Sequence, residues 1–145
     1  MKRITVLLSL LLMLSVAQVN AMDHWEILFN KKVILKGTSD QEDQTLHFKP
    51  RAFKSTDRFT LKYTSEDSEA GWNRTFYLTD TKDENLKTVI IDKQSGELSV
   101  KASAVIELMN KKEPVFIYTM SLPKDRKKAA AVRVRRILLC KIEWN

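Results

Sequence analysis

The residue types with the clearest chemical potential lie in Met22-Asp23-His24. If the preceding segment is removed after Ala21, a free amine, two backbone amides and the imidazole of His24 can close a square-planar nitrogen cage, which suits Cu(II) or Ni(II). The alternative is that His24 has no metal role and only precedes the first strand. His24 and His47 are the only histidines, which excludes most His-based triads and multi-histidine metal sites within one chain.

A second candidate is a set of basic residues in the last quarter of the chain. Four are predicted in a loop after Pro123 and two on one face of the following strand: Lys124, Arg126, Lys127, Lys128, Arg133 and Arg135. Strand geometry separates the last two guanidinium groups by about 7 Å. The set predicts binding to phosphates or sulfates of an anionic envelope glycan or lipid. The alternative is solubilising charge beside aggregation-prone strands. Without an aromatic ladder, we expect no nucleic-acid partner.

Trp72 is the third candidate, in a predicted loop of sequence Ala-Gly-Trp-Asn-Arg at 70–74. A loop tryptophan beside amide and guanidinium groups can stack on a sugar or anchor a partner. The alternative, which we favour, is that Trp72 caps the open end of the core.

Catalytic patterns are weak elsewhere. The acidic clusters at 40–43 and 66–69 at best half match a calcium loop, and there is no glycine-rich phosphate loop or nucleophile motif. Cys140 is the single cysteine, which excludes an internal disulfide. Its apolar neighbours predict a buried side chain, whereas a reactive thiol needs a polar, cationic setting. We therefore expect no enzyme activity and no cofactor.

The elements that would position these residues are mostly strands. Apolar residues alternate with polar ones from Ile27 onward, as in strands with one face on a core. Even-numbered positions of 98–108, 116–122 and 132–144 form three long apolar rows. Asn30-Lys31-Lys32 is predicted as a hairpin turn. Ala129–Ala131 could begin a helix, but the β-branched residues that follow favour a strand. The pattern predicts an all-β fold, an antiparallel β-sandwich (Ig-like or jelly-roll-like) of eight or nine strands.

Arg136 interrupts the last of these rows, between Val134 and Leu138. A buried guanidinium without a partner is costly. We therefore expect a bulge at Arg135-Arg136, an acidic partner, or an edge position that lets the side chain reach water.

The block Ile117–Asp125, continued by Ala129–Arg136, resembles the C-terminal part of small exported bacterial proteins of unknown function. The resemblance covers under a quarter of residues 22–145. It implies an exported compartment and carries no activity with it.

The N-terminal segment predicts export independently. Lys2 and Arg3 precede an uncharged, leucine-rich run over residues 4–16, and small residues follow up to Ala21. This order is typical of a signal peptide, and the run is too short for a membrane-spanning helix. We expect residues 1–21 to be removed, with a cut after Ala17 as the alternative. No lipid-attachment cysteine lies nearby, so residues 22–145 are expected as one periplasmic or secreted domain that does not span the membrane.

These observations favour a non-enzymatic binding or adaptor domain of the bacterial envelope, whose partner is a protein. One alternative is recognition of an anionic glycan or lipid by the basic residues. The other is Cu(II) or Ni(II) binding at Met22–His24.

Overall fold

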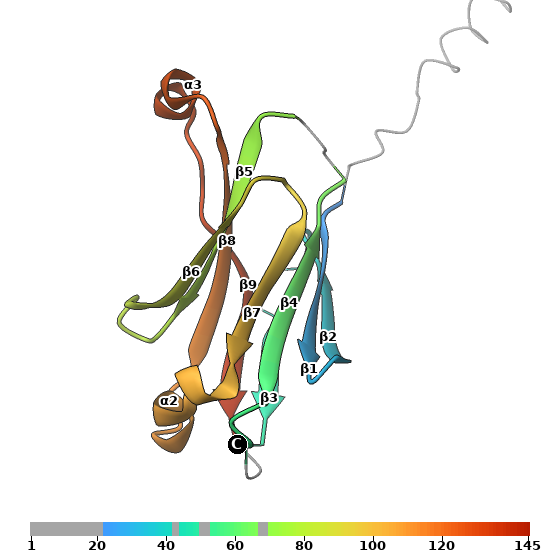
Figure 1. Cartoon of the computed structure of the whole chain (residues 1–145), viewed down its shortest axis with the longest axis vertical. Coiled ribbons are helices and arrows are strands. Elements are labelled where there is room, and N and C mark those ends of the chain that lie inside the picture. The colour runs from blue at the N-terminus through green and yellow to red at the C-terminus, as the bar shows by residue number, and fades with distance from the viewer. Residues whose placement is uncertain (1–21, 42–43, 50–52, 67–69) are drawn as a thin grey trace, which may run out of the picture.

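Nine strands in two sheets make up most of the described chain in a computed structural model (Figure 1). The structure describes residues 22–41, 44–49, 53–66 and 70–145. The predicted signal peptide, residues 1–21, lies outside the described residues. The strands are β1 (His24–Phe29), β2 (Lys32–Thr38), β3 (Thr45–Phe48), β4 (Arg58–Thr64), β5 (Trp72–Thr79), β6 (Asn85–Ile91), β7 (Gly96–Lys101), β8 (Val115–Pro123) and β9 (Ile137–Trp144).

The sheets pack face to face, which confirms the predicted β-sandwich (Figure 1). The four-stranded sheet has the order β2-β1-β4-β7, and the five-stranded sheet has the order β3-β9-β8-β5-β6. The prediction of purely antiparallel pairing is wrong at one place, because β3 and β9 run parallel. A parallel pair needs a long crossover connection, and here most of the chain lies between the two strands.

The first hairpin follows the prediction. Asn30 and Lys31 both have positive φ, 47° and 70°, which is the backbone of the tight turn that matches strand twist. Asn30 also donates from Nδ2 to Asp57 Oδ1 (2.8 Å) and accepts at Oδ1 from the amide of Arg58 (3.0 Å). The turn is therefore fixed both by its own backbone and by the loop that leads into β4.

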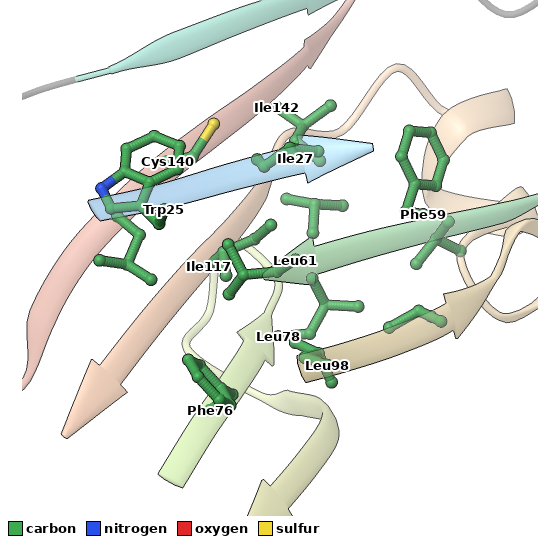
Figure 2. Close-up of a cluster of buried hydrophobic side chains, with 14 of the residues drawn as sticks. Trp25, Ile27, Phe59, Leu61, Phe76, Leu78, Leu98, Ile117, Cys140 and Ile142 are labelled. Atoms are coloured by element: carbon green, nitrogen blue, oxygen red, sulfur yellow. The ribbon is translucent and has the colours of Figure 1, made fainter. Parts of the chain in front are cut away.

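The core lies between the sheets and is built from their inward rows (Figure 2). Trp25, Ile27 and Leu61 come from the four-stranded sheet, and Phe76 and Ile117 from the other. Gly37 permits this packing, because a Cβ atom there would lie 2.1 Å from the Trp25 ring. Cys140 is fully buried in the core, as predicted.

The apolar row predicted to face the core from β8 faces outward instead. The buried residues of this strand are Val115, Ile117, Thr119 and Pro123. The outward row is the more apolar of the two, because the inward row also contains Thr119 and Ser121, so alternation alone favours the wrong face. Thr119 faces inward because Arg74 and the Thr75 carbonyl satisfy its hydroxyl there, at 3.3 and 3.2 Å. Phe116, Tyr118, Met120 and Leu122 therefore lie on the outer face of the five-stranded sheet.

Neither of the other two apolar rows is a strand throughout. The row over 98–108 was predicted as strand, but β7 ends at Lys101 and is followed by a 3-10 turn (η1, Ala102–Ala104) and by α2 (Ile106–Asn110). The Val105 amide donates to Ala102 (3.0 Å), and the Met109 amide donates to Val105 (3.0 Å). Burial of both Val105 and Met109 ties this connection to the core.

The predicted strand over 132–136 is also wrong. Residues 132–136 form no strand, and they follow α3 (Arg126–Ala131), which Asp125 caps by accepting from the Lys128 amide at 2.9 Å. β9 begins only at Ile137, and a bulge at Leu139 moves Leu138 out of the inward row that contains Cys140. Arg133 and Arg135 therefore do not project from a strand. In the part of the chain that the structure describes, no helix has the length and apolarity that crossing a bilayer requires.

Candidate functional site: the outer face of the five-stranded sheet

The two outer faces of the sandwich differ in chemistry. On the four-stranded sheet, β4 and β7 present a polar face, which consists of Arg58, Thr60, Lys62, Glu97 and Ser99. The five-stranded sheet presents an apolar face, which consists of Tyr77, Ile90, Phe116, Tyr118, Met120 and Leu122. Ile90 is exposed and the other five are half-buried. Large apolar side chains gathered on an outer face favour a binding role, so the apolar face is the main candidate site.

Aromatic rings form the centre of the apolar face. The rings of Phe116 and Tyr118 stack with a centroid distance of 6.3 Å and an interplanar angle of 21°. Both are half-buried, as are Met120 and Leu122 beside them. On the edge strand β6, Ile90 extends the face and is 67% exposed. Such a surface offers large, rigid contact area, which is what anchors protein interfaces.

Arg136 lies across this face and carries a positive charge over it. Its guanidinium carbon is 4.2 Å from the centroid of the Tyr118 ring and 6.0 Å from that of Tyr77. Its Nη2 atom lies 2.7 Å from Asp83 Oδ1 in the turn between β5 and β6. The prediction of an acidic partner for Arg136 is thus confirmed, whereas the bulge lies at Leu139 and not at Arg135-Arg136.

A second cation borders the face on β9. The Lys141 Nζ atom is 5.9 Å from the Phe116 ring centroid and forms a close ion pair with Glu143. The hydrogen bond from Lys141 lowers the pKa of the Glu143 carboxyl below its ordinary value. His47 Nδ1 on β3 lies 3.4 Å from the same carboxylate. Charged groups thus surround the aromatic centre, which is the usual anatomy of a docking surface.

Trp72 is the first residue of β5 and not part of a loop. It is half-buried opposite Pro123 and lines a shallow surface recess with Gln94, Ser95 and Lys124. Among the described side chains that form or contact the core cluster, Trp72 is absent, so the favoured role as a core cap is not what the fold uses. Trp72 lies apart from the outward rows that form the apolar face.

Met22, Asp23 and His24 are held at the start of β1. The Met22 nitrogen lies 2.9 Å from Glu66 Oε2, and His24 Nε2 lies 3.3 Å from Glu66 Oε1. The Asp23 amide donates to Ser39 Oγ at 3.2 Å. A metal cage would have to break that hydrogen bond. Metal binding here stays a prediction; among the described residues, no three metal-ligating side chains gather at one place.

A buried polar network, which the sequence did not predict, joins the sheets near this end. Arg74 is 4% exposed, and its guanidinium carbon lies 4.1 Å from the Tyr63 ring centroid. Its Nε donates to the Gln94 carbonyl at 2.5 Å, and Nη2 lies 3.7 Å from Asp23 Oδ2. Arg74 lies two residues before Phe76 and so shares its inward row. This period-two spacing is the feature of the sequence that could have indicated a buried arginine.

Tyr63 completes this network by donating a short hydrogen bond to Asp23. Burial of the ring and the Asp23 hydrogen bond raise the pKa of the Tyr63 hydroxyl above its ordinary range. Arg74, Asp23 and Tyr63 satisfy one another, so we assign them a structural role: they connect β5 to β4 and to the start of β1.

The basic residues lie between β8 and β9, in residues 124–136, which we call the basic tip. Lys124 pairs with Asp92 at 2.6 Å. The other predicted anion-binding residues are exposed, on α3 or in the segment after it: Arg126, Lys127, Lys128, Arg133 and Arg135. The structure therefore brings the predicted set into one connection, although without the predicted strand.

Cys140 has no exposed surface on which to react. Burial raises the pKa of its thiol to about 12, so the thiolate is scarce at neutral pH. It acts as a small apolar residue of the core.

Comparisons of the sequence with models of known protein families and with curated proteins find no match. The fold and the candidate site therefore define the class: a two-sheet β-sandwich with one polar and one apolar outer face.

Proposed function

We propose that this protein is an exported, non-enzymatic binding domain of the bacterial envelope that docks a protein through its apolar face. The observation that carries the proposal is the outward direction of Phe116, Tyr118, Met120 and Leu122 on β8. The row behind them, which contains Val115 and Ile117, already supplies the core. Folding therefore does not require the outward row to be apolar, whereas binding a partner does.

The partner we propose presents apolar side chains flanked by carboxylates. Arg136 and Lys141 place cations at the Tyr118 and Phe116 rings, each beside one carboxylate of this chain. The exposed cations of the basic tip continue the positive charge beyond Leu122. Complementary charge speeds association and fixes orientation, while aromatic anchors supply most of the affinity.

A second copy of this chain is a poorer fit to the same face. Two copies would bring side chains of like charge together, because Arg136 and Lys141 lie on this face in both copies. Like-charge contacts across an interface cost binding energy.

Export is supported by the order of residues over 1–21: two basic residues, an uncharged leucine-rich run and small residues. A non-enzymatic role is supported by the lack of catalytic motifs in the sequence. Both belong to the proposal, and fractionation of cells that express the tagged full chain tests the first.

Site-specific photo-crosslinking tests the docking surface. A photoreactive residue replaces Met120 on the apolar face or, as the matched control, Thr60 on the polar face. We expect a single dominant adduct from position 120 alone, whose crosslinked peptide, sequenced by mass spectrometry, is rich in apolar and acidic residues. Tyr118→Ser should remove the adduct while leaving the urea unfolding midpoint close to that of the parent chain.

Three results would contradict the proposal. Adducts of equal yield from both positions would mean nonspecific contact. A crosslink only to another copy of this chain would make the face a homodimer interface. An adduct that survives Tyr118→Ser would place the contact elsewhere.

A further inference from the structure

The basic tip accounts for the net positive charge of residues 22–145. Residues 124–136 hold seven cationic side chains and one anionic side chain, a net charge of +6. The remainder of residues 22–145 holds 16 cationic and 17 anionic side chains, and is almost neutral. Net charge spread for solubility would not collect in one connection, so the concentration of charge points to a specific anionic ligand.

The tip stands away from the sandwich. α3 lies beyond the ends of the strands, at the end of the molecule opposite α2 (Figure 1). Among the other helices and strands, β8 is the one that α3 contacts most. Ion pairs hold the tip at both ends: Lys124 with Asp92 at 2.6 Å, and Arg136 with Asp83 at 2.7 Å. The segment between these two anchors is therefore presented to whatever lies beyond the end of the sandwich.

The cations between the two anchors are available. Within the described part of the chain, no acidic side chain lies within ion-pair distance of the following five: Arg126, Lys127, Lys128, Arg133 and Arg135. The one acidic residue of the tip, Asp125, accepts from the Lys128 amide and so caps α3. The side chains, and not the helix end, are thus the anion-binding groups.

Exposed apolar residues accompany these cations. Val132 is 37% exposed and Val134 is 36% exposed, and they alternate with Arg133 and Arg135. A soluble phosphate or a polyanionic glycan has no apolar surface for a valine side chain to contact. Peripheral membrane binders, in contrast, combine cations that meet lipid phosphates with apolar side chains that enter the boundary between headgroups and acyl chains.

We propose that the basic tip binds the surface of a membrane that contains anionic phospholipids, with Arg133 and Arg135 on the phosphates and Val132 and Val134 in the interface. This goes beyond the proposed protein docking, because it uses one end of the sandwich and leaves the apolar face free. A membrane-bound tip would orient the whole domain and so set the direction in which the apolar face is presented.

Vesicle flotation of purified residues 22–145 tests the proposal. We expect binding to vesicles of phosphatidylcholine and phosphatidylglycerol, and none to vesicles of phosphatidylcholine alone. Arg133→Gln with Arg135→Gln should weaken binding by at least about tenfold, given roughly 1 kcal/mol per cation at an anionic surface. Lys31→Gln with Lys32→Gln is the charge-matched control, in the β1–β2 turn at the other end of the molecule, and should bind like the parent chain.

Val132→Ser with Val134→Ser separates lipid from other anions. We expect this variant to bind the anionic vesicles several-fold more weakly, and to be released at lower salt. Binding unchanged by the valine substitutions would reduce the tip to a simple anion site and overturn the lipid proposal. Equal loss in the Lys31/Lys32 control, or equal binding to both vesicle types, would also overturn it. Photo-crosslinking from position 120 in the arginine variant distinguishes failure of the tip from failure of the apolar face.

Discussion

β4 and β8 occupy comparable places in their sheets, but the outward row of β4 is polar and that of β8 is apolar. β4 lies between β1 and β7, and β8 between β9 and β5. Both bury one row in the same core. Outward, β4 presents Arg58, Thr60 and Lys62, whereas β8 presents aromatic and aliphatic side chains. Folding requires only the inward rows, so the difference between the outward rows reflects what each face meets: water on one side and, in our proposal, a partner on the other.

Arg74 connects the two sheets, and the largest effect is expected from breaking this connection. Arg74→Ala leaves Asp23 and Tyr63 without their buried partner, so we expect a loss of about 3–5 kcal/mol in the free energy of unfolding. Urea titration followed by circular dichroism measures it. Arg74→Lys keeps the charge but loses the guanidinium fork. Its free energy of unfolding should lie between those of the parent chain and Arg74→Ala. A loss below about 1 kcal/mol would show that the network does not hold the sheets together.

Within β8, the inward and outward rows should respond differently to truncation. Ile117→Ala opens a cavity in the core and should cost about 2–5 kcal/mol. Met120→Ala on the apolar face should cost about 1 kcal/mol or less. Urea midpoints of the two variants, measured side by side, provide the test. The reverse order would mean that the apolar face is the true core side of β8.

Alkaline pH should lower the free energy of unfolding, because Tyr63 and Cys140 are buried in their neutral forms. Burial raises the folded-state pKa of Tyr63 above its ordinary 10.0, and that of Cys140 from 9.0 to about 12. The folded state thus favours their neutral forms. This stability is fully present below the ordinary pKa values, and is lost as pH rises from about 9 toward the folded-state values.

Unfolding by urea at about pH 8 and about pH 11 measures this loss. Tyr63→Phe removes the ionisable hydroxyl and should show a smaller drop between the two pH values than the parent chain does. The same drop in both chains would assign the alkaline effect to other groups.

The polar face should give the smallest effect. Lys62 is exposed on β4 and makes no part of the core, so Lys62→Ala should change the free energy of unfolding by at most about 0.5 kcal/mol. It should also leave the crosslink from position 120 intact. Loss of that crosslink in Lys62→Ala would remove the functional contrast between the two outer faces.

Local sequence determined much of this protein. Alternation predicted the sandwich, because a strand with one face on a core repeats every two residues. The Asn30-Lys31 turn and the burial of Cys140 also followed from local residue types. Helix α3 is only partly predictable: Ala129–Ala131 and the Asp125 cap favour it, whereas the valines that follow favour a strand.

Tertiary structure decided which face of β8 is the core. The inward row of Val115, Ile117 and Thr119 is less apolar than the outward row, so periodicity alone favours the wrong face. The choice depends on Arg74, 45 residues away in the chain, which satisfies the Thr119 hydroxyl in the interior. Likewise, the partners of Arg136 come from β5, β8 and the turn at Asp83. Burial and charge pairing depend on contacts between distant segments, so the apolar face became identifiable only once the sheets had been assembled.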